Sequence, residues 1–154
     1  MENTRERSDF QYLSDHEGII LEQAAETILG VPIDQLGSEF LPEIDDYLYN
    51  SPEWLRNEYK LIFRIFNMKI MGLVFIGRLK NFTNMEIDQK TKYVINFACS
   101  RLPMIRSAFT GLKSICAWGY YSHESAFADF PGKTIGREHE TPTLLYGKEA
   151  WKPR

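Results

Sequence analysis

Apolar residues recur at helical spacing along most of the chain, and residues 102–136 show both this pattern and its end. Pro103 suits the first turn of a helix, where its missing N–H costs nothing. An apolar stripe follows over residues 103–121 at the spacing of one helix face: Ile105, Phe109, Leu112, Cys116 and Tyr120. Arg106 and Lys113 lie two turns apart on another face, so both cations point the same way. That face is either solvated or meets an acidic surface, in this chain or on a partner.

Two acidic helices are predicted in the first fifty residues. Ser14 and Glu17 form a capping box that opens a helix ending at residue 29, where Gly30 follows. A second helix is expected over residues 38–49, and its buried side is Phe40, Ile44, Tyr47 and Leu48. Asp45 and Asp46 are adjacent and therefore diverge on a helix, so we interpret both as solvated acids.

The middle of the chain predicts the central helix of a bundle. The sequence Ser51-Pro52 is a helix start, and the apolar residues of 52–76 occur on all sides, as in a buried helix. Thr83 and Glu86 form a further capping box, opening a helix to about residue 100. Its expected inner face is Ile87, Val94, Ile95, Ala98 and Cys99, widened by Tyr93 and Phe97. With no strand-like alternation of useful length, the fold predicted is an all-α bundle of four to five helices.

Periodicity disappears after residue 121. Residues 122–154 carry three prolines and three glycines together with large apolar residues, among them Phe127, Phe130 and Trp151. Disordered tails are usually poor in aromatic residues, so this composition indicates a segment that packs on a surface. We therefore divide the chain into a helical bundle, 1–121, and a long irregular tail, 122–154, that binds a partner.

Charge is distributed unevenly along an otherwise ordinary globular composition. The chain has 154 residues, 44% hydrophobic and 25% charged, which suits one soluble domain. Residues 1–50 hold twelve acids and two bases (−10), whereas residues 51–121 hold eleven bases and four acids (+7). We interpret this as an acidic N-terminal part lying on a basic middle. The bases form no run, which disfavours nucleic-acid binding.

Motifs for independent chemistry are missing from the sequence. It contains no G-x-G-x-x-G, no P-loop and no H-E-x-x-H. Cys99 and Cys116 have no metal-ligand spacing and are expected to be buried free thiols, with a disulfide as the alternative. His16 should be exposed in a first helical turn. His123 and His139 leave open a free-standing helical enzyme or ligand-binding protein, but a binding or subunit protein is favoured.

Four segments, in order, resemble one family. They are residues 21–29 (LEQAAETIL), 44–48 (IDDYL), 82–86 (FTNME), and 106–113 (RSAFTGLK) followed by 120–122 (YYS). Their succession is similar to the gluconate 2-dehydrogenase subunit 3 family. The resemblance implies a non-catalytic small subunit that stabilises or assembles a larger FAD-dependent oxidoreductase of the glucose–methanol–choline type. The partner then carries the FAD, and some such complexes add a cytochrome c subunit.

The expected partner-binding residues follow from that interpretation. They are Arg106, Lys113, Tyr120, Tyr121, Phe127, Phe130 and Trp151. No catalytic residue, cofactor or metal is expected in this chain. The first fourteen residues have no apolar run and no twin arginine, so we expect a cytoplasmic complex, with co-export to the periplasm alongside the partner as the alternative.

Overall fold

The computed structural model describes residues 10–122, and the described residues form helices joined by short loops, without a strand. The α-helices are α1 (Asp15–Leu29), α2 (Phe40–Tyr49), α3 (Glu53–Phe66), α4 (Lys69–Ile76), α5 (Ile87–Ala98) and α6 (Pro103–Tyr121). Two 3-10 turns, η2 (Ile33–Gln35) and η3 (Phe82–Asn84), lie between them. The all-α prediction is confirmed, with six α-helices in this part of the chain rather than four or five.

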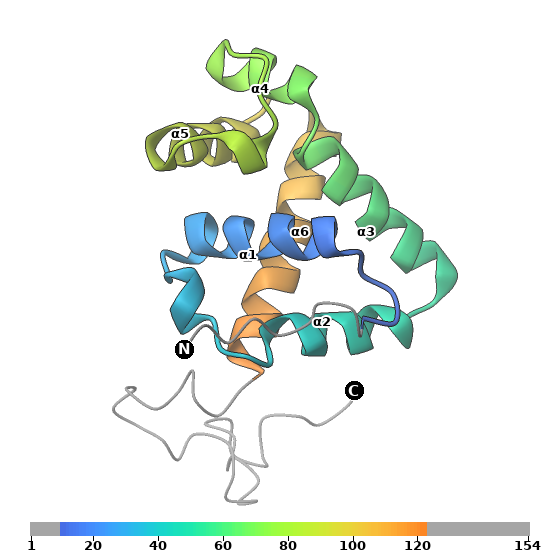
Figure 1. Cartoon of the computed structure of the whole chain (residues 1–154). Coiled ribbons are helices and arrows are strands. Elements are labelled where there is room, and N and C mark those ends of the chain that lie inside the picture. Colours follow the sequence, from blue (N-terminus) through green and yellow to red (C-terminus); the bar gives the residue numbers. More distant parts are fainter. Residues whose placement is uncertain (1–9, 123–154) are drawn as a thin grey trace, which may run out of the picture.

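Helix α6 is the element on which most of the others pack. It contacts α1, α2, α3 and α5, and it runs behind α1 towards α2, with α2 and α4 at opposite ends of the molecule (Figure 1). Ile105, Leu112, Ile115 and Cys116 are buried on its inner side, so the predicted stripe is largely confirmed. The central helix is therefore α6, not the predicted helix 52–76.

Local capping signals place α1 correctly. The Ser14 hydroxyl accepts the Glu17 N–H, and the Glu17 carboxylate accepts the Ser14 N–H at 2.9 Å. Gly30 ends the helix with φ +70°, a left-handed conformation that glycine adopts without strain. These contacts involve only neighbouring residues, so the sequence alone could predict them.

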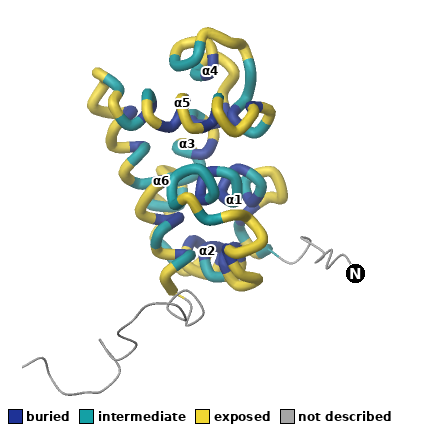
Figure 2. Tube along the Cα trace, turned by 90° about the vertical axis from the view of Figure 1, so that its left-hand side faces the viewer, coloured by how far each residue is buried: buried dark blue, intermediate teal, exposed yellow. Residues whose placement is uncertain are grey.

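The predicted helix 52–76 is wrong as one element, because the chain breaks into α3 and α4 at Asn67 and Met68. Asn67 is buried, its side-chain oxygen accepts the Thr83 N–H at 3.1 Å, and its carbonyl oxygen accepts from the Asn81 side chain at 2.8 Å. These bonds to residues beyond α4 stabilise the break. Much of the apolar surface expected to be buried is consequently exposed, and α4 appears mostly exposed or half-buried in Figure 2.

The capping box predicted at Thr83 and Glu86 is also wrong. Thr83 lies inside η3, and Glu86 precedes α5 without a side-chain cap. The inner face of α5 also differs from the predicted one, because Ile87, Ile95 and Cys99 are exposed.

An aromatic cluster decides which face of α5 is buried. Phe66 of α3 lies 5.3 Å from Tyr93 and 5.2 Å from Phe97 between ring centroids, and Phe82 completes the cluster 4.4 Å from Phe66. The Tyr93 hydroxyl donates to the Phe66 carbonyl oxygen at 2.7 Å. Burial raises the pKa of Tyr93 well above its usual value. Tyr93 and Phe97 are therefore the centre of the α5 contact rather than its margin.

Candidate functional site

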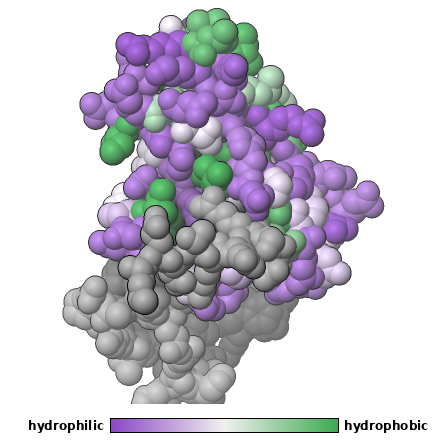
Figure 3. All heavy atoms as spheres, in the orientation of Figure 1, coloured by the Kyte–Doolittle hydropathy of each residue, from purple (hydrophilic) through white to green (hydrophobic). Residues whose placement is uncertain are grey.

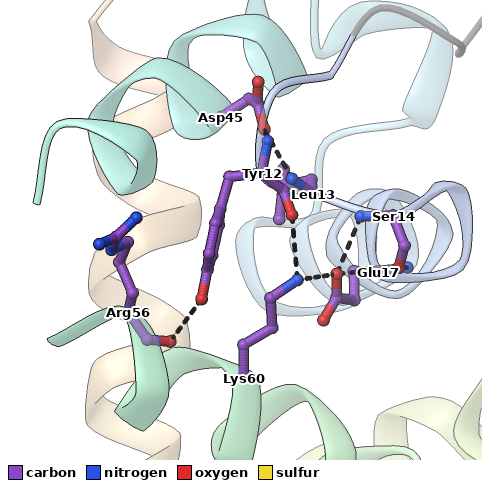
Figure 4. A network of polar contacts seen from close by, with 7 residues as sticks. All are labelled: Tyr12, Leu13, Ser14, Glu17, Asp45, Arg56 and Lys60. Atoms are coloured by element: carbon purple, nitrogen blue, oxygen red, sulfur yellow. Dashed lines mark hydrogen bonds and ion pairs between the residues drawn. The ribbon is translucent and has the colours of Figure 1, made fainter. Parts of the chain in front are cut away.

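A polar network joins the segment before α1 to α2 and α3 (Figure 4). Asp45 of α2 is only 4% exposed, and its carboxylate accepts the backbone N–H groups of Gln11, Tyr12 and Leu13 at 2.7, 2.9 and 2.7 Å. The prediction of a solvated Asp45 is therefore wrong, whereas Asp46 is exposed as expected. A carboxylate holding three backbone donors is a structural anchor, not a free base.

The Tyr12 side chain extends this network to α3. The Lys60 ammonium lies 4.3 Å from the Tyr12 ring centroid, and the Tyr12 hydroxyl donates to the Arg56 carbonyl oxygen at 3.1 Å. Lys60 also donates to the Tyr12 carbonyl oxygen and forms an ion pair with Glu17. This ion pair links the acidic N-terminal part of the chain to its basic middle part, which is the arrangement that the charge distribution predicts.

The pKa of Glu17 is lowered by this arrangement. Partial burial by itself raises the pKa, but hydrogen bonds from the Lys60 ammonium and from the Ser14 N–H and hydroxyl outweigh it. A carboxylate with a lowered pKa stabilises the fold at neutral pH and loses that contribution as acid protonates it.

Glu17→Gln should lower the free energy of unfolding by about 1 kcal/mol at pH 7. The difference from the wild type should shrink as the pH falls below the ordinary glutamate value of about 4.3. Denaturant unfolding followed by circular dichroism at several pH values measures it. The exposed Glu53→Gln is the control, and a difference that grows in acid would contradict the assigned ion pair.

A hollow of about 360 Å³ lies between the start of α1 and the end of α3. Its lining includes His16, Glu17, Lys60, Arg64 and Asn67. His16 is exposed, as predicted, and its Nε2 lies 3.0 Å from the Asn67 side-chain nitrogen. Lys60 and Glu17 pair with each other. The polar side chains described in this lining therefore bond mainly to one another. Among them, no nucleophile is oriented by a base.

The predicted partner-binding residues of α6 divide into two groups. Lys113 and Tyr121 are exposed, as a binding role requires. Arg106 is exposed but donates to the Ser100 carbonyl oxygen at 2.8 Å, which stabilises the chain after α5. Tyr120 is half-buried against the core, with its ring centroid 5.0 Å from that of Tyr121. Phe127, Phe130 and Trp151 lie outside the described residues, as do His123 and His139.

Tyr47, Trp118 and Tyr121 form an exposed aromatic surface where α2 meets the end of α6. The ring centroids of Tyr47 and Trp118 are 4.8 Å apart, and the exposed fractions are 37% for Tyr47, 42% for Trp118 and 45% for Tyr121. Trp118 and Tyr121 are three residues apart on α6 and therefore neighbours on its surface. Tyr47 was expected to be buried, and that prediction is wrong.

Gly119 explains how α2 comes so close to α6. A Cβ at this position would lie 2.7 Å from Ile44 Cδ1, so only glycine permits this approach without rearrangement. Sequence reasoning missed Trp118 because the residue lies outside both faces considered for residues 103–121. Its signal was its spacing of three residues from Tyr121.

The two cysteines are free and lie in different environments. Cys116 is fully buried, and burial raises the pKa of its thiol to about 12, so it is unreactive. Cys99 is exposed, which contradicts the prediction of two buried thiols. Within residues 10–122 no group of three or more His, Cys, Asp or Glu side chains is arranged to hold a metal ion.

Comparison with known proteins gives no match: no family model, no curated protein and no solved structure resembles this chain significantly. No helix among the described residues is long and apolar enough to cross a bilayer.

Proposed function

We propose that this chain is a non-catalytic small subunit that binds and stabilises, or helps to assemble, the large subunit of an FAD-dependent sugar, sugar-acid or alcohol dehydrogenase. The proposal starts from the ordered motif resemblance. In it the flavin and the catalytic base belong to the large subunit, and a cytochrome c subunit is a possible third component.

The aromatic surface of Tyr47, Trp118 and Tyr121 is the observation that carries the binding role. Contiguous exposed apolar patches mark interaction sites, and Trp and Tyr are enriched among the residues that dominate the energetics of protein interfaces. Two of the three lie within motif segments 44–48 and 120–122. The same surface lies where α6 ends at Tyr121, which is where the proposed partner-binding tail begins.

The other motif residues support the proposal in a different way, because several of them have structural roles. Leu21, Ala24 and Ala25 are buried on α1, and Phe82 is fully buried. Asp45 anchors the segment before α1. The motif segments thus contribute both buried core residues and part of one exposed aromatic surface. This combination is consistent with a helical subunit whose main role is binding.

Trp118→Ala should weaken binding of the large flavoprotein subunit by about 30-fold or more, since interface tryptophans commonly contribute 2 kcal/mol or more. Titration of the purified flavoprotein with each variant measures the loss. Because Trp118 is 42% exposed, the variant should retain its helical circular-dichroism signal.

Trp54→Ala is the matched control, because Trp54 is 63% exposed in the first turn of α3 and lies outside the aromatic surface. It should bind the flavoprotein like the wild type. Unchanged affinity for Trp118→Ala, or an equal loss for Trp54→Ala, would refute the assigned surface.

A further inference from the structure

Helix α4 exposes apolar side chains on one face. Ile70, Leu73 and Val74 have the spacing of one helix face, and Val74 is 66% exposed. Leu79, just after the helix, is 62% exposed. Figure 3 shows apolar surface gathered at the end of the molecule where α4 lies.

The opposite side of α4 is firmly packed. Gly72 is buried against the backbone of residues 78–80, and the Phe75 ring lies 5.5 Å from that of Tyr93 and 5.4 Å from that of Phe97. The Asn96 side chain donates to the Phe75 carbonyl oxygen at 2.8 Å. The core thus orients α4, with Ile70, Leu73 and Val74 directed outward.

Cations accompany this apolar face. Residues 59–85 contain no Asp or Glu, and the basic residues in or just after α4 are Lys69, Arg78 and Lys80. Lys69 is the first residue of α4, Arg78 follows the helix, and both are exposed.

The opposite end of the molecule has the opposite charge. Glu39 and Asp46 are exposed in or beside α2, and Figures 1 and 2 place α2 at the end remote from α4. An anionic surface would therefore attract the α4 end and repel the α2 end.

The chemistry of the α4 face favours lipid over protein. The residues that contribute most of the binding energy in protein interfaces are enriched in Trp, Tyr and Arg, whereas Leu and Val are under-represented among them. The exposed α4 face is aliphatic, and the aromatic surface lies on other helices. Binding to an anionic membrane surface grows with the apolar area that enters the interface and with attraction of Lys and Arg to the lipid headgroups.

We propose that the α4 end of the molecule docks on an anionic phospholipid bilayer. Ile70, Leu73, Val74 and Leu79 enter the boundary between headgroups and acyl chains, and Lys69 and Arg78 contact lipid phosphates. The protein would then attach to the membrane surface through α4, a helix that the core fixes in place. The aromatic surface would be directed away from the bilayer. The inference goes beyond the proposed function and does not depend on it.

The test is flotation of the full chain with vesicles of phosphatidylcholine alone or with about one third phosphatidylglycerol. Binding is expected with the anionic vesicles only and should decline as salt screens the cations. Val74→Glu should weaken it by about tenfold or more. Lys69→Gln with Arg78→Gln, which leaves the apolar face intact, should weaken it by about fivefold per cation removed.

Trp54→Glu is the matched control, because it adds the same charge at a site of similar exposure in the first turn of α3, the end of that helix remote from α4. It should float like the wild type. Absence of binding to anionic vesicles at low salt, or equal losses for Val74→Glu and Trp54→Glu, would overturn the proposal. Loss of flavoprotein binding by Val74→Glu without any vesicle binding would assign the face to a protein interface and overturn it too.

Discussion

Replacing Asp45 with alanine is expected to lower the free energy of unfolding by about 3 kcal/mol, because three backbone donors lose their shared acceptor. The Leu13 N–H is buried and cannot gain water in exchange, whereas the Gln11 and Tyr12 N–H groups are partly accessible. The expected loss of unfolding free energy is therefore smaller than three times the cost of one unsatisfied buried N–H group. Denaturant unfolding followed by circular dichroism measures it from the shift in midpoint.

Two variants sharpen the Asp45 test. Asp45→Asn keeps one acceptor oxygen but loses the charge, so its cost should fall between those of wild type and Asp45→Ala. Asp46→Ala is the matched control, since Asp46 is exposed and its side chain bonds only Asn50 among the contacts described. It should cost less than about 0.5 kcal/mol. Equal costs for Asp45→Ala and Asp46→Ala would mean that Asp45 is not an anchor.

Gly72→Ala should destabilise the protein by about 3 kcal/mol, although alanine is the better helix former by about 1 kcal/mol. The added Cβ would overlap the Lys80 carbonyl oxygen and lie 2.9 Å from that of Arg78. Both atoms belong to the main chain and cannot be relieved by a change of rotamer. The loop over residues 78–80 would have to move away from α4, and the midpoint of thermal or denaturant unfolding reports the cost.

Gly111→Ala is the matched control for this second prediction. It is also a helical glycine, but a Cβ there would meet only the end of the Ile62 side chain, at 3.1 Å. That side chain can shift, so the gain in helix propensity should leave the variant near neutral or slightly stabilised. If Gly72→Ala behaved like Gly111→Ala, the tight packing of α4 would be refuted.

Features of the fold that depend on neighbouring residues could be predicted from sequence. The start of α1 followed from Ser14 and Glu17, and the start of α6 followed from Pro103. The break between α3 and α4 could not be predicted, because it depends on bonds from Asn67 to Asn81 and Thr83. Apolar residues alone do not distinguish a buried helix from one that exposes an apolar face.

The buried face of α5 was missed for a related reason. Both faces of that helix carry large apolar residues, and the choice between them is made by Phe66 of α3. Asp45 was missed because a carboxylate in a helix is normally solvated, and only the approach of residues 11–13 gives it three donors.

The candidate site was predicted in part. The exposed Tyr121 belongs to the aromatic surface, but Tyr47 and Trp118 come together only through the close packing of α2 on α6 at Gly119. Arg106 and Tyr120 have contacts within the fold that spacing could not reveal.

Affinity capture of the tagged full chain from its native host, followed by an absorption spectrum of the eluate, tests the proposed function most directly. The proposal predicts a yellow complex in which one large subunit carries flavin and is retained through washing. A colourless eluate containing this chain alone would contradict it.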